Sequence, residues 1–384
     1  MRIRVHLTGA ATAIAVLVAA PALAAAQVVA ACANCGDGSA LIARFGLREH
    51  SVPVRELPGW TRPRRIIVHG PDAWAEPLRA AVPGVEIITA PTPDSAARLL
   101  GDATVYVGIC TPSIIAAGHN LRWIHLWSAG ADPCAGLIAA SGRPIVLTNG
   151  QALFGPQIAE HTIGFILALS RHLHTYRDEQ RARQWSHAIG DPRVVTGLGI
   201  SELEGKHLLV IGLGGIGTEV AKRAHALGMR VRATRNSGRE RPAFVEYVGL
   251  AHEAVTLAGW ADVVVNSTPL TADTRGMFNT AFFAAMKPTA YFINVGRGES
   301  AVTSDLTSAL QAGRIAGAAL DVTDPEPLPV NHPLWAMPNV IITPHVAVAS
   351  DLVLSRILTL AAENLARYVR GERLVSVVDV RRGY

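Results

Sequence analysis

A glycine-rich turn between an apolar run and a helical pattern constrains the fold of this chain more than any other stretch. Residues 208–211 have the length and composition of a buried strand, and residues 212–217 follow with the sequence GLGGIG. Apolar residues recur at helical spacing over 220–227, Gly228 ends the helical pattern, and residues 229–233 predict a second strand. The stretch therefore has the β-turn-α-β order in which a G-x-G-x-x-G sequence is informative.

Three glycines of this turn have separate tasks in a dinucleotide site. Gly212 permits a tight turn, Gly214 lets backbone N–H groups approach a pyrophosphate, and Gly217 allows the helix to pack closely on the strand. The N-terminus of the helix also presents partial positive charge to phosphates. The turn therefore predicts a dinucleotide site, and the alternative is a glycine-rich turn in some other α/β protein.

Length and composition predict a globular protein of two or three domains. The chain has 384 residues, of which 49% are apolar and 17% are charged. The net charge of +5 comes without a run of basic residues interleaved with aromatic ones. Nucleic acid is therefore not an expected partner.

The first 31 residues differ in composition from the rest of the chain. Arg2 and Arg4 precede a segment rich in Ala, Val and Leu, and small residues follow at 24–26. This order is typical of a signal peptide and predicts export to the periplasm, whereas a misassigned start or an uncleaved anchor would leave a cytoplasmic location open. Beyond this leader, no apolar stretch is long enough to predict a membrane span.

Four cysteines are too few to predict a disulfide scaffold. Cys32 and Cys35 have C-x-x-C spacing, but they lie in the leader without a βαβ context, so a redox role is not expected. Cys110 and Cys134 have no partners at metal-ligand spacing, and we expect both to be small buried side chains. No metal site is predicted.

Strand-like runs and helical patterns alternate before the glycine turn. Residues 36–62 show no clear periodicity, and regular structure is expected to begin at Arg65. The alternation from there to Asn149 predicts βαβ units and a parallel sheet. A loop after one strand, Ser128-Ala129-Gly130, could hold a carboxylate through its backbone N–H groups, or be a plain turn. A single long helix is expected from Ile158 to about Trp185.

The alternation continues after the glycine turn, and four strands there end in polar residues. These residues are Thr268, Arg297, Asp321 and His345. Because the carboxyl ends of parallel strands lie at one edge of a sheet, all four are expected to open on the crevice that the pyrophosphate occupies.

Arg297, His345 and Glu326 together suit one reaction, the reduction of a 2-oxo acid. A guanidinium binds a carboxylate in a bidentate manner and polarises a neighbouring carbonyl. An imidazolium can protonate the developing alkoxide, and a carboxylate can orient that imidazole. Each residue taken alone could be structural: Arg297 a strand cap, Glu326 a solvated loop charge, and His345 a core histidine.

From about Ile124 to Leu365 the chain resembles the D-isomer-specific 2-hydroxyacid dehydrogenases. The matching blocks, in chain order, are SAGAD (128–132), IAEHTIGFILALSR (158–171), VIGLGGIG (210–217), STPLTADTRG (267–276), INVGRG (293–298), GAALDVTDPEPLP (317–329) and ITPH (342–345).

The resemblance implies an α/β protein with two Rossmann-like domains, each built on a doubly wound parallel sheet. A flavodoxin-like substrate domain would be split between 63–152 and 346–384, and an NAD(P)-binding domain would span 153–345. Arg297 would bind substrate, His345 would be the acid/base and Glu326 its partner, while Ser128, Ala129 and Gly130 would bind the substrate carboxylate. The cofactor contacts expected from the turn and the resemblance are Gly212, Gly214, Gly215, Ile216, Gly217, Arg235, Ser237, Thr268, Pro269, Val295, Arg297, Asp321 and His345.

The resemblance also implies a homodimer and hydride transfer between a nicotinamide cofactor and a small 2-oxo or 2-hydroxy acid of D configuration. A dinucleotide-sensing binding protein without turnover is the alternative. Where NAD-dependent members carry an acidic residue, this chain has Arg235, with Ser237 and Arg239 close behind. Because guanidinium and hydroxyl groups hold a 2′-phosphate, we expect NADP to be preferred and NAD to remain usable.

Overall fold

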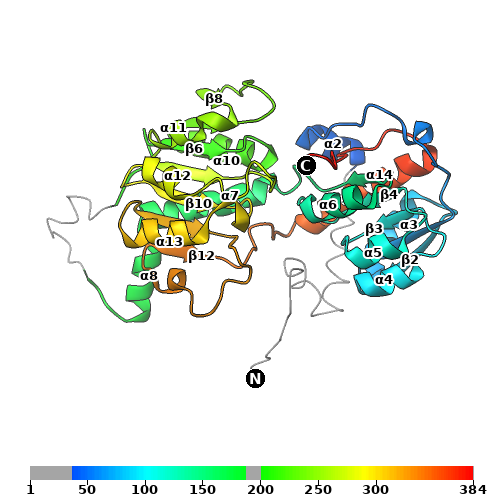
Figure 1. Ribbon diagram of the computed structural model, residues 1–384, viewed down its shortest axis with the longest axis horizontal. Coiled ribbons are helices and arrows are strands. Elements are labelled where there is room, and N and C mark those ends of the chain that lie inside the picture. The colour runs from blue at the N-terminus through cyan, green and yellow to red at the C-terminus, as the bar shows by residue number, and fades with distance from the viewer. Residues whose placement is uncertain (1–36, 187–199, 384) are drawn as a thin grey trace. The chain divides into compact units, whose positions relative to one another are not determined.

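The computed structural model describes residues 37–186 and 200–383 (Figure 1), so the predicted leader lies outside the described residues. The described chain forms two compact units. Unit 1 combines the residues up to Leu153 with those from Ser350 onward, and unit 2 spans Phe154–Ala349. The boundaries expected from the sequence lay at 152/153 and 345/346.

Unit 1 is built on a five-stranded sheet in which all strands run parallel, in the order β2-β1-β3-β4-β5. This is the flavodoxin-like order. Its strands β3 and β4 are short and have no exposed side chain, as is typical of a parallel sheet covered by helices on both faces. The strands are β1 (Arg65–His69), β2 (Glu86–Ala90), β3 (Val105–Val107), β4 (Trp123–His125) and β5 (Val146–Thr148), and the principal helices are α3 (Asp72–Ala81), α4 (Pro93–Leu99), α5 (Pro112–Ala117), α6 (Asp132–Ser141) and α14 (Val353–Arg370).

Unit 2 is built on a seven-stranded parallel sheet in the order β12-β11-β10-β9-β6-β7-β8. This is the strand order of a doubly wound dinucleotide-binding domain with one added strand. From β6 the sheet grows first toward β8 and then, starting with β9, in the opposite direction. The strands are β6 (His207–Ile211), β7 (Arg230–Thr234), β8 (Tyr247–Gly249), β9 (Val263–Asn266), β10 (Tyr291–Asn294), β11 (Gly317–Leu320) and β12 (Val340–Ile342). The helices are α7 (Gly155–Ser170), α8 (Leu173–Arg181), α10 (Gly215–Ala226), α11 (Ala254–Ala258), α12 (Thr280–Ala285) and α13 (Thr303–Gln311). The predicted α/β class with two parallel sheets is confirmed.

The single helix expected from Ile158 to Trp185 is wrong, because the chain breaks between α7 and α8. His172 has a left-handed backbone with φ of 53° and separates the two helices. The break coincides with a change of surroundings: α7 buries an apolar face, whereas α8 has no buried residue. A helix without a face to bury is under no packing constraint to continue the axis of its neighbour.

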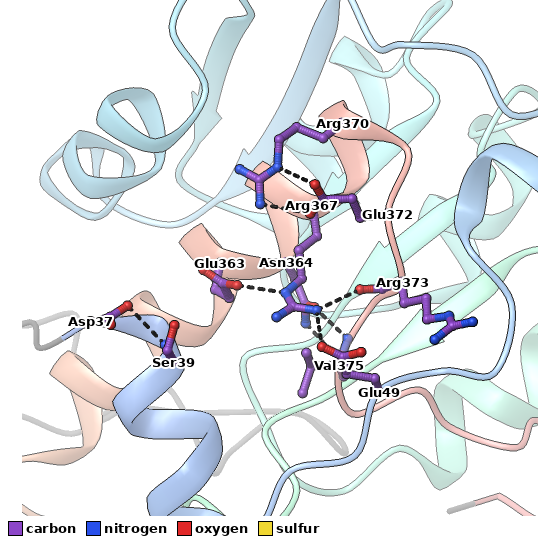
Figure 2. A network of polar contacts seen from close by, with 10 residues as sticks. All are labelled: Asp37, Ser39, Glu49, Glu363, Asn364, Arg367, Arg370, Glu372, Arg373 and Val375. Atoms are coloured by element: carbon purple, nitrogen blue, oxygen red, sulfur yellow. Dashed lines mark hydrogen bonds and ion pairs between the residues drawn. The ribbon is translucent and has the colours of Figure 1, made fainter.

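The expectation that regular structure begins at Arg65 is also wrong. Helix α2 spans Gly38–Phe45, and Asp37 caps it by accepting a hydrogen bond from the Ser39 backbone N–H. In Figure 2 the Arg367 guanidinium of α14 reaches Glu49 from the segment after α2, at 2.7 Å, and Glu363 of its own helix, at 2.6 Å. The lead-in is therefore fixed by contacts to the C-terminal helix, which no local pattern encodes.

Cys110 and Cys134 form a disulfide, which the sequence did not predict. Cys134 is buried as expected, whereas Cys110 is only partly buried. Their Cα atoms lie 5.5 Å apart across a sequence separation of 24 residues. Cys110 follows β3, and Cys134 lies in the first turn of α6 after β4. Because β3 and β4 are neighbours in the sheet, their carboxyl ends bring the two sulfur atoms together.

Reduction of this disulfide is expected to destabilise unit 1 alone. A crosslink that closes a loop of this length contributes about 3 kcal/mol in the chain-entropy account. We expect hydrogen exchange in β3 and α6 to accelerate in the Cys110→Ser/Cys134→Ser double variant, with exchange in unit 2 unchanged. Reductant should reproduce the effect in the wild type and have no effect on the variant; equal exchange in all samples would show that the bond is not a constraint.

Candidate active site

The glycine turn lies between β6 and α10 and leaves space for a phosphate group. Gly212 has φ of 96°, a conformation that favours glycine. A Cβ on Gly217 would lie 2.2 Å from the Gly212 carbonyl oxygen, whereas a Cβ on Gly214 would meet no atom within 4 Å. The turn is thus closely packed on the side of the helix and open at Gly214. With Gly215 and Ile216 in the first turn of α10, these residues fit a pyrophosphate at the helix N-terminus.

Arg235 follows β7 and folds back onto the glycine turn. Its Nε and Nη2 atoms donate to the Leu213 carbonyl oxygen at 3.0 and 2.8 Å. Ser237 is exposed, two residues further on. Arg239 has a different role, because its guanidinium binds Glu253 and Tyr247 and holds the pKa of the Glu253 carboxyl at about 2. Arg235, rather than Arg239, therefore borders the glycine turn.

Two buried asparagines connect the ends of β9 and β10, a pair that the sequence analysis missed. Asn266 Nδ2 donates to Asn294 Oδ1 at 2.9 Å, and neither residue is more than 1% exposed. Asn266 Oδ1 accepts from the Thr268 hydroxyl at 2.7 Å, and Asn294 Nδ2 donates to the Arg297 carbonyl oxygen at 2.9 Å. The pair therefore fixes the loops that carry Thr268 and Arg297. A polar residue at the last position of an apolar strand was the available signal.

Arg297 lies in the loop that follows β10, and its side chain is half-buried. Its Nη1 donates a hydrogen bond to the Gly296 carbonyl oxygen at 2.9 Å. Val295 is buried beside it, and Pro269 lies in the neighbouring loop after β9. Strand β10 pairs with β11, and β11 pairs with β12, the strand that leads to His345. Two strand spacings, about 10 Å, separate the end of β10 from that of β12.

His345 and Glu326 form a direct hydrogen bond. His345 Nδ1 lies 2.7 Å from Glu326 Oε1, and both side chains are partly exposed. Because an ionised carboxylate only accepts hydrogen bonds, Nδ1 carries the proton, and Nε2 is the nitrogen that can exchange a proton with a ligand. The two residues predicted to form the acid/base pair are thus brought together.

The segment that carries His345 is held by the buried carboxylate of Asp321. Asp321 is 4% exposed, and its oxygens accept from the Thr343 hydroxyl at 2.5 Å and from the backbone N–H groups of Val346 and Ala347 at 2.9 and 3.0 Å. His345 itself has φ of 54° and donates its backbone N–H to the Asp321 carbonyl oxygen at 2.8 Å. Asp321 was predicted only as a dinucleotide contact, and the structure adds this anchoring role.

The loop Ser128-Ala129-Gly130 belongs to unit 1. Its carbonyl oxygens are occupied: Ser128 accepts from Gly150 N–H at 2.9 Å, Ala129 from Asn149 Nδ2 at 2.5 Å, and Gly130 from the Ser128 hydroxyl at 2.8 Å. Within residues 37–186 and 200–383, no acceptor is found for the backbone N–H groups of Ala129 and Gly130. Donors without acceptors are suited to an anion such as a carboxylate.

Two further predictions concern absences and apply to the described ranges only. No group of three His, Cys, Asp or Glu side chains there is placed to hold a metal ion. None of the helices in those ranges is long and apolar enough to cross a membrane.

Comparison with known proteins identifies the family of the chain. Residues 163–347 match the family model described as D-isomer specific 2-hydroxyacid dehydrogenase, NAD binding domain. The chain is 36% identical to a glyoxylate reductase of Thermofilum pendens over 269 residues, 69% of this chain and 77% of the relative. It is also 36% identical to the glyoxylate reductase/hydroxypyruvate reductase of Mus musculus over 265 residues, 68% of this chain and 78% of the relative.

Solved structures share the fold over nearly their whole length. A D-isomer specific 2-hydroxyacid dehydrogenase family protein from Aeromonas salmonicida aligns with a TM-score of 0.71 at 32% identity, covering 83% of this chain and 99% of that one. An NADPH-dependent glyoxylate/hydroxypyruvate reductase from Sinorhizobium meliloti, solved with NADP and sulfate, aligns with a TM-score of 0.70 at 27% identity over the same shares. The chain therefore belongs to the D-isomer-specific 2-hydroxyacid dehydrogenase family and is an NAD(P)-dependent oxidoreductase that acts on CH–OH groups.

Proposed function

We propose that this enzyme transfers hydride between NADP(H) and the C2 atom of a small D-2-hydroxy acid or its 2-oxo form, with glyoxylate- and hydroxypyruvate-like acids as substrates. The observation that carries the proposal is the 2.7 Å contact between His345 and Glu326, two strands away from Arg297. The relatives from Thermofilum pendens and Mus musculus are named glyoxylate reductase and glyoxylate reductase/hydroxypyruvate reductase, and these names favour glyoxylate- and hydroxypyruvate-like substrates.

The chain's own groups have distinct roles in this proposal. The bound nicotinamide supplies or accepts the hydride. Arg297 binds the acid and polarises its carbonyl, because a guanidinium matches the geometry of a carboxylate. His345 Nε2 donates a proton to the alkoxide oxygen during reduction and removes it during oxidation. Glu326 keeps the imidazole in the required tautomer, and the backbone N–H groups at Ser128, Ala129 and Gly130 are assigned to the substrate carboxylate.

Replacement of His345 is expected to lower kcat strongly and to leave the affinity for the cofactor unchanged. General acid catalysis contributes about 10²- to 10⁴-fold, so His345→Gln should lower kcat for glyoxylate reduction by that factor. Glu326→Gln should lower kcat less, because an amide oxygen can still accept from Nδ1 but carries no charge. Absorbance at 340 nm measures turnover, and fluorescence titration measures NADPH affinity.

The matched control for Glu326→Gln is Glu179→Gln, at a partly exposed position of α8. This control should behave as wild type. Wild-type protein that binds NADPH but turns over no acid in a panel of 2-oxo acids would support the binding-only alternative and refute the proposed activity.

We expect NADPH to be preferred over NADH through Arg235 and Ser237. A hydrogen bond to a charged group contributes about 1.5–3 kcal/mol, which corresponds to roughly 10- to 100-fold in kcat/KM. Arg235→Ala should therefore lower the NADPH-to-NADH ratio of kcat/KM by about that factor. Arg239→Ala should not, because Arg239 is bound to Glu253 and Tyr247. A wild-type enzyme whose kcat/KM for NADH equals or exceeds that for NADPH would contradict the preference.

We also propose that the enzyme is a homodimer, as the family resemblance implies. Leu173 and Trp185 are 54% and 88% exposed in unit 2, and large exposed apolar side chains favour an interface. Light scattering of the full chain should give twice its mass of 40.6 kDa. Trp185→Glu should shift the mass toward one chain, and a monomeric wild type at micromolar concentration would refute the proposal.

A further inference from the structure

His161 of α7 faces the carboxylate that holds the His345 segment. Its Nε2 atom lies 3.0 Å from the Thr343 hydroxyl oxygen and 3.8 Å from Asp321 Oδ1. Its ring packs edge-on against Phe165 of the same helix, with ring centroids 4.5 Å apart. These contacts all lie within unit 2, and the proposed chemistry does not use His161.

The hydrogen bonds determine which nitrogen of His161 carries a proton. The Thr343 hydroxyl has one proton and donates it to Asp321 Oδ1 at 2.5 Å. A hydroxyl that has given its proton to a carboxylate can only accept from its other neighbour. His161 Nε2 must therefore be the donor. Neutral His161 thus has the Nε2–H tautomer, opposite to His345, whose Nδ1 donates to Glu326.

We propose that His161 is a positioning residue for catalysis. Its Nε2–H fixes the Thr343 hydroxyl on Asp321, so that the Asp321 carboxylate is held by donors before and after His345. Without that donor, the Thr343 hydroxyl is free to rotate to another partner. Asp321 keeps its two backbone donors from Val346 and Ala347, so the fold persists while the His345 imidazole is held less firmly. This inference rests on the proposed function, because the positioned group is the proposed acid/base.

The test compares two replacements of His161. His161→Phe keeps a ring against Phe165 but has no donor, and we expect kcat for glyoxylate reduction to fall about 10- to 100-fold, as a small misplacement of a reacting group does. KM for NADPH and the melting temperature should stay within error of wild type. His161→Gln offers an amide donor near the position of Nε2 and should recover most of the rate. His225→Phe, at an exposed position of α10, is the control and should have no effect.

A double-variant cycle shows whether His161 acts through Thr343. Thr343→Val removes the hydroxyl, so the His161→Phe/Thr343→Val variant should be no slower than Thr343→Val alone. Losses that multiply in the double variant would overturn the proposal. So would a His161→Phe enzyme with wild-type kcat, or a glutamine variant as slow as the phenylalanine variant.

A measurement without turnover separates this inference from the proposed function. In protein labelled with ¹⁵N-histidine, long-range ¹H–¹⁵N spectra should show His161 as the Nε2–H tautomer. The His161 signals are assigned as those that disappear in the His161→Phe variant. An Nδ1–H tautomer would overturn the hydrogen-bond arrangement. A wild-type enzyme that reduces no 2-oxo acid would refute the proposed function. The tautomer measurement would still show whether His161 Nε2 donates to Thr343, because it requires no turnover.

Discussion

The proposed acid/base depends on one buried carboxylate. Asp321 directly follows β11 and is 4% exposed. Its three side-chain hydrogen bonds go to the segment on both sides of His345. Ionised groups are rarely buried unless they are well satisfied, because desolvation costs several kcal/mol. Here the satisfied carboxylate stabilises a left-handed backbone at His345, a conformation that non-glycine residues seldom adopt. His345 is thus held through its backbone by Asp321 and through its side chain by Glu326.

Much of unit 2 could be predicted because its information is local. The glycines of the turn, the strand before them and the helix after them are adjacent in sequence, and each residue type has a physical reason to be there. The same holds for the strand ends: Thr268, Arg297, Asp321 and His345 all follow short apolar runs, and parallel pairing places those ends on one edge of the sheet. Neither inference requires knowledge of a contact between distant residues.

Three features that the sequence did not predict depend on such contacts. The segment after helix α2 is held by Arg367, which lies 318 residues from Glu49 in the chain. The disulfide between Cys110 and Cys134 arises because β3 and β4 are neighbours in the sheet. His161 and Thr343 are separated by 182 residues, and neither was a predicted site residue. In each case the residue type allowed the contact, but only the fold brought the partners together.

Each of the two units has its own kind of group suited to recognising an acid. Arg297, Glu326 and His345 in unit 2 are side chains with fixed partners, and the chemistry at C2 needs each of them at a defined place. The loop at Ser128 in unit 1 offers backbone N–H groups whose carbonyl neighbours are already occupied. Backbone donors bind any carboxylate, a group that every 2-oxo acid has, so they do not distinguish one acid from another. Discrimination among acids must therefore come from side chains that contact the rest of the substrate, while the reaction type follows from unit 2.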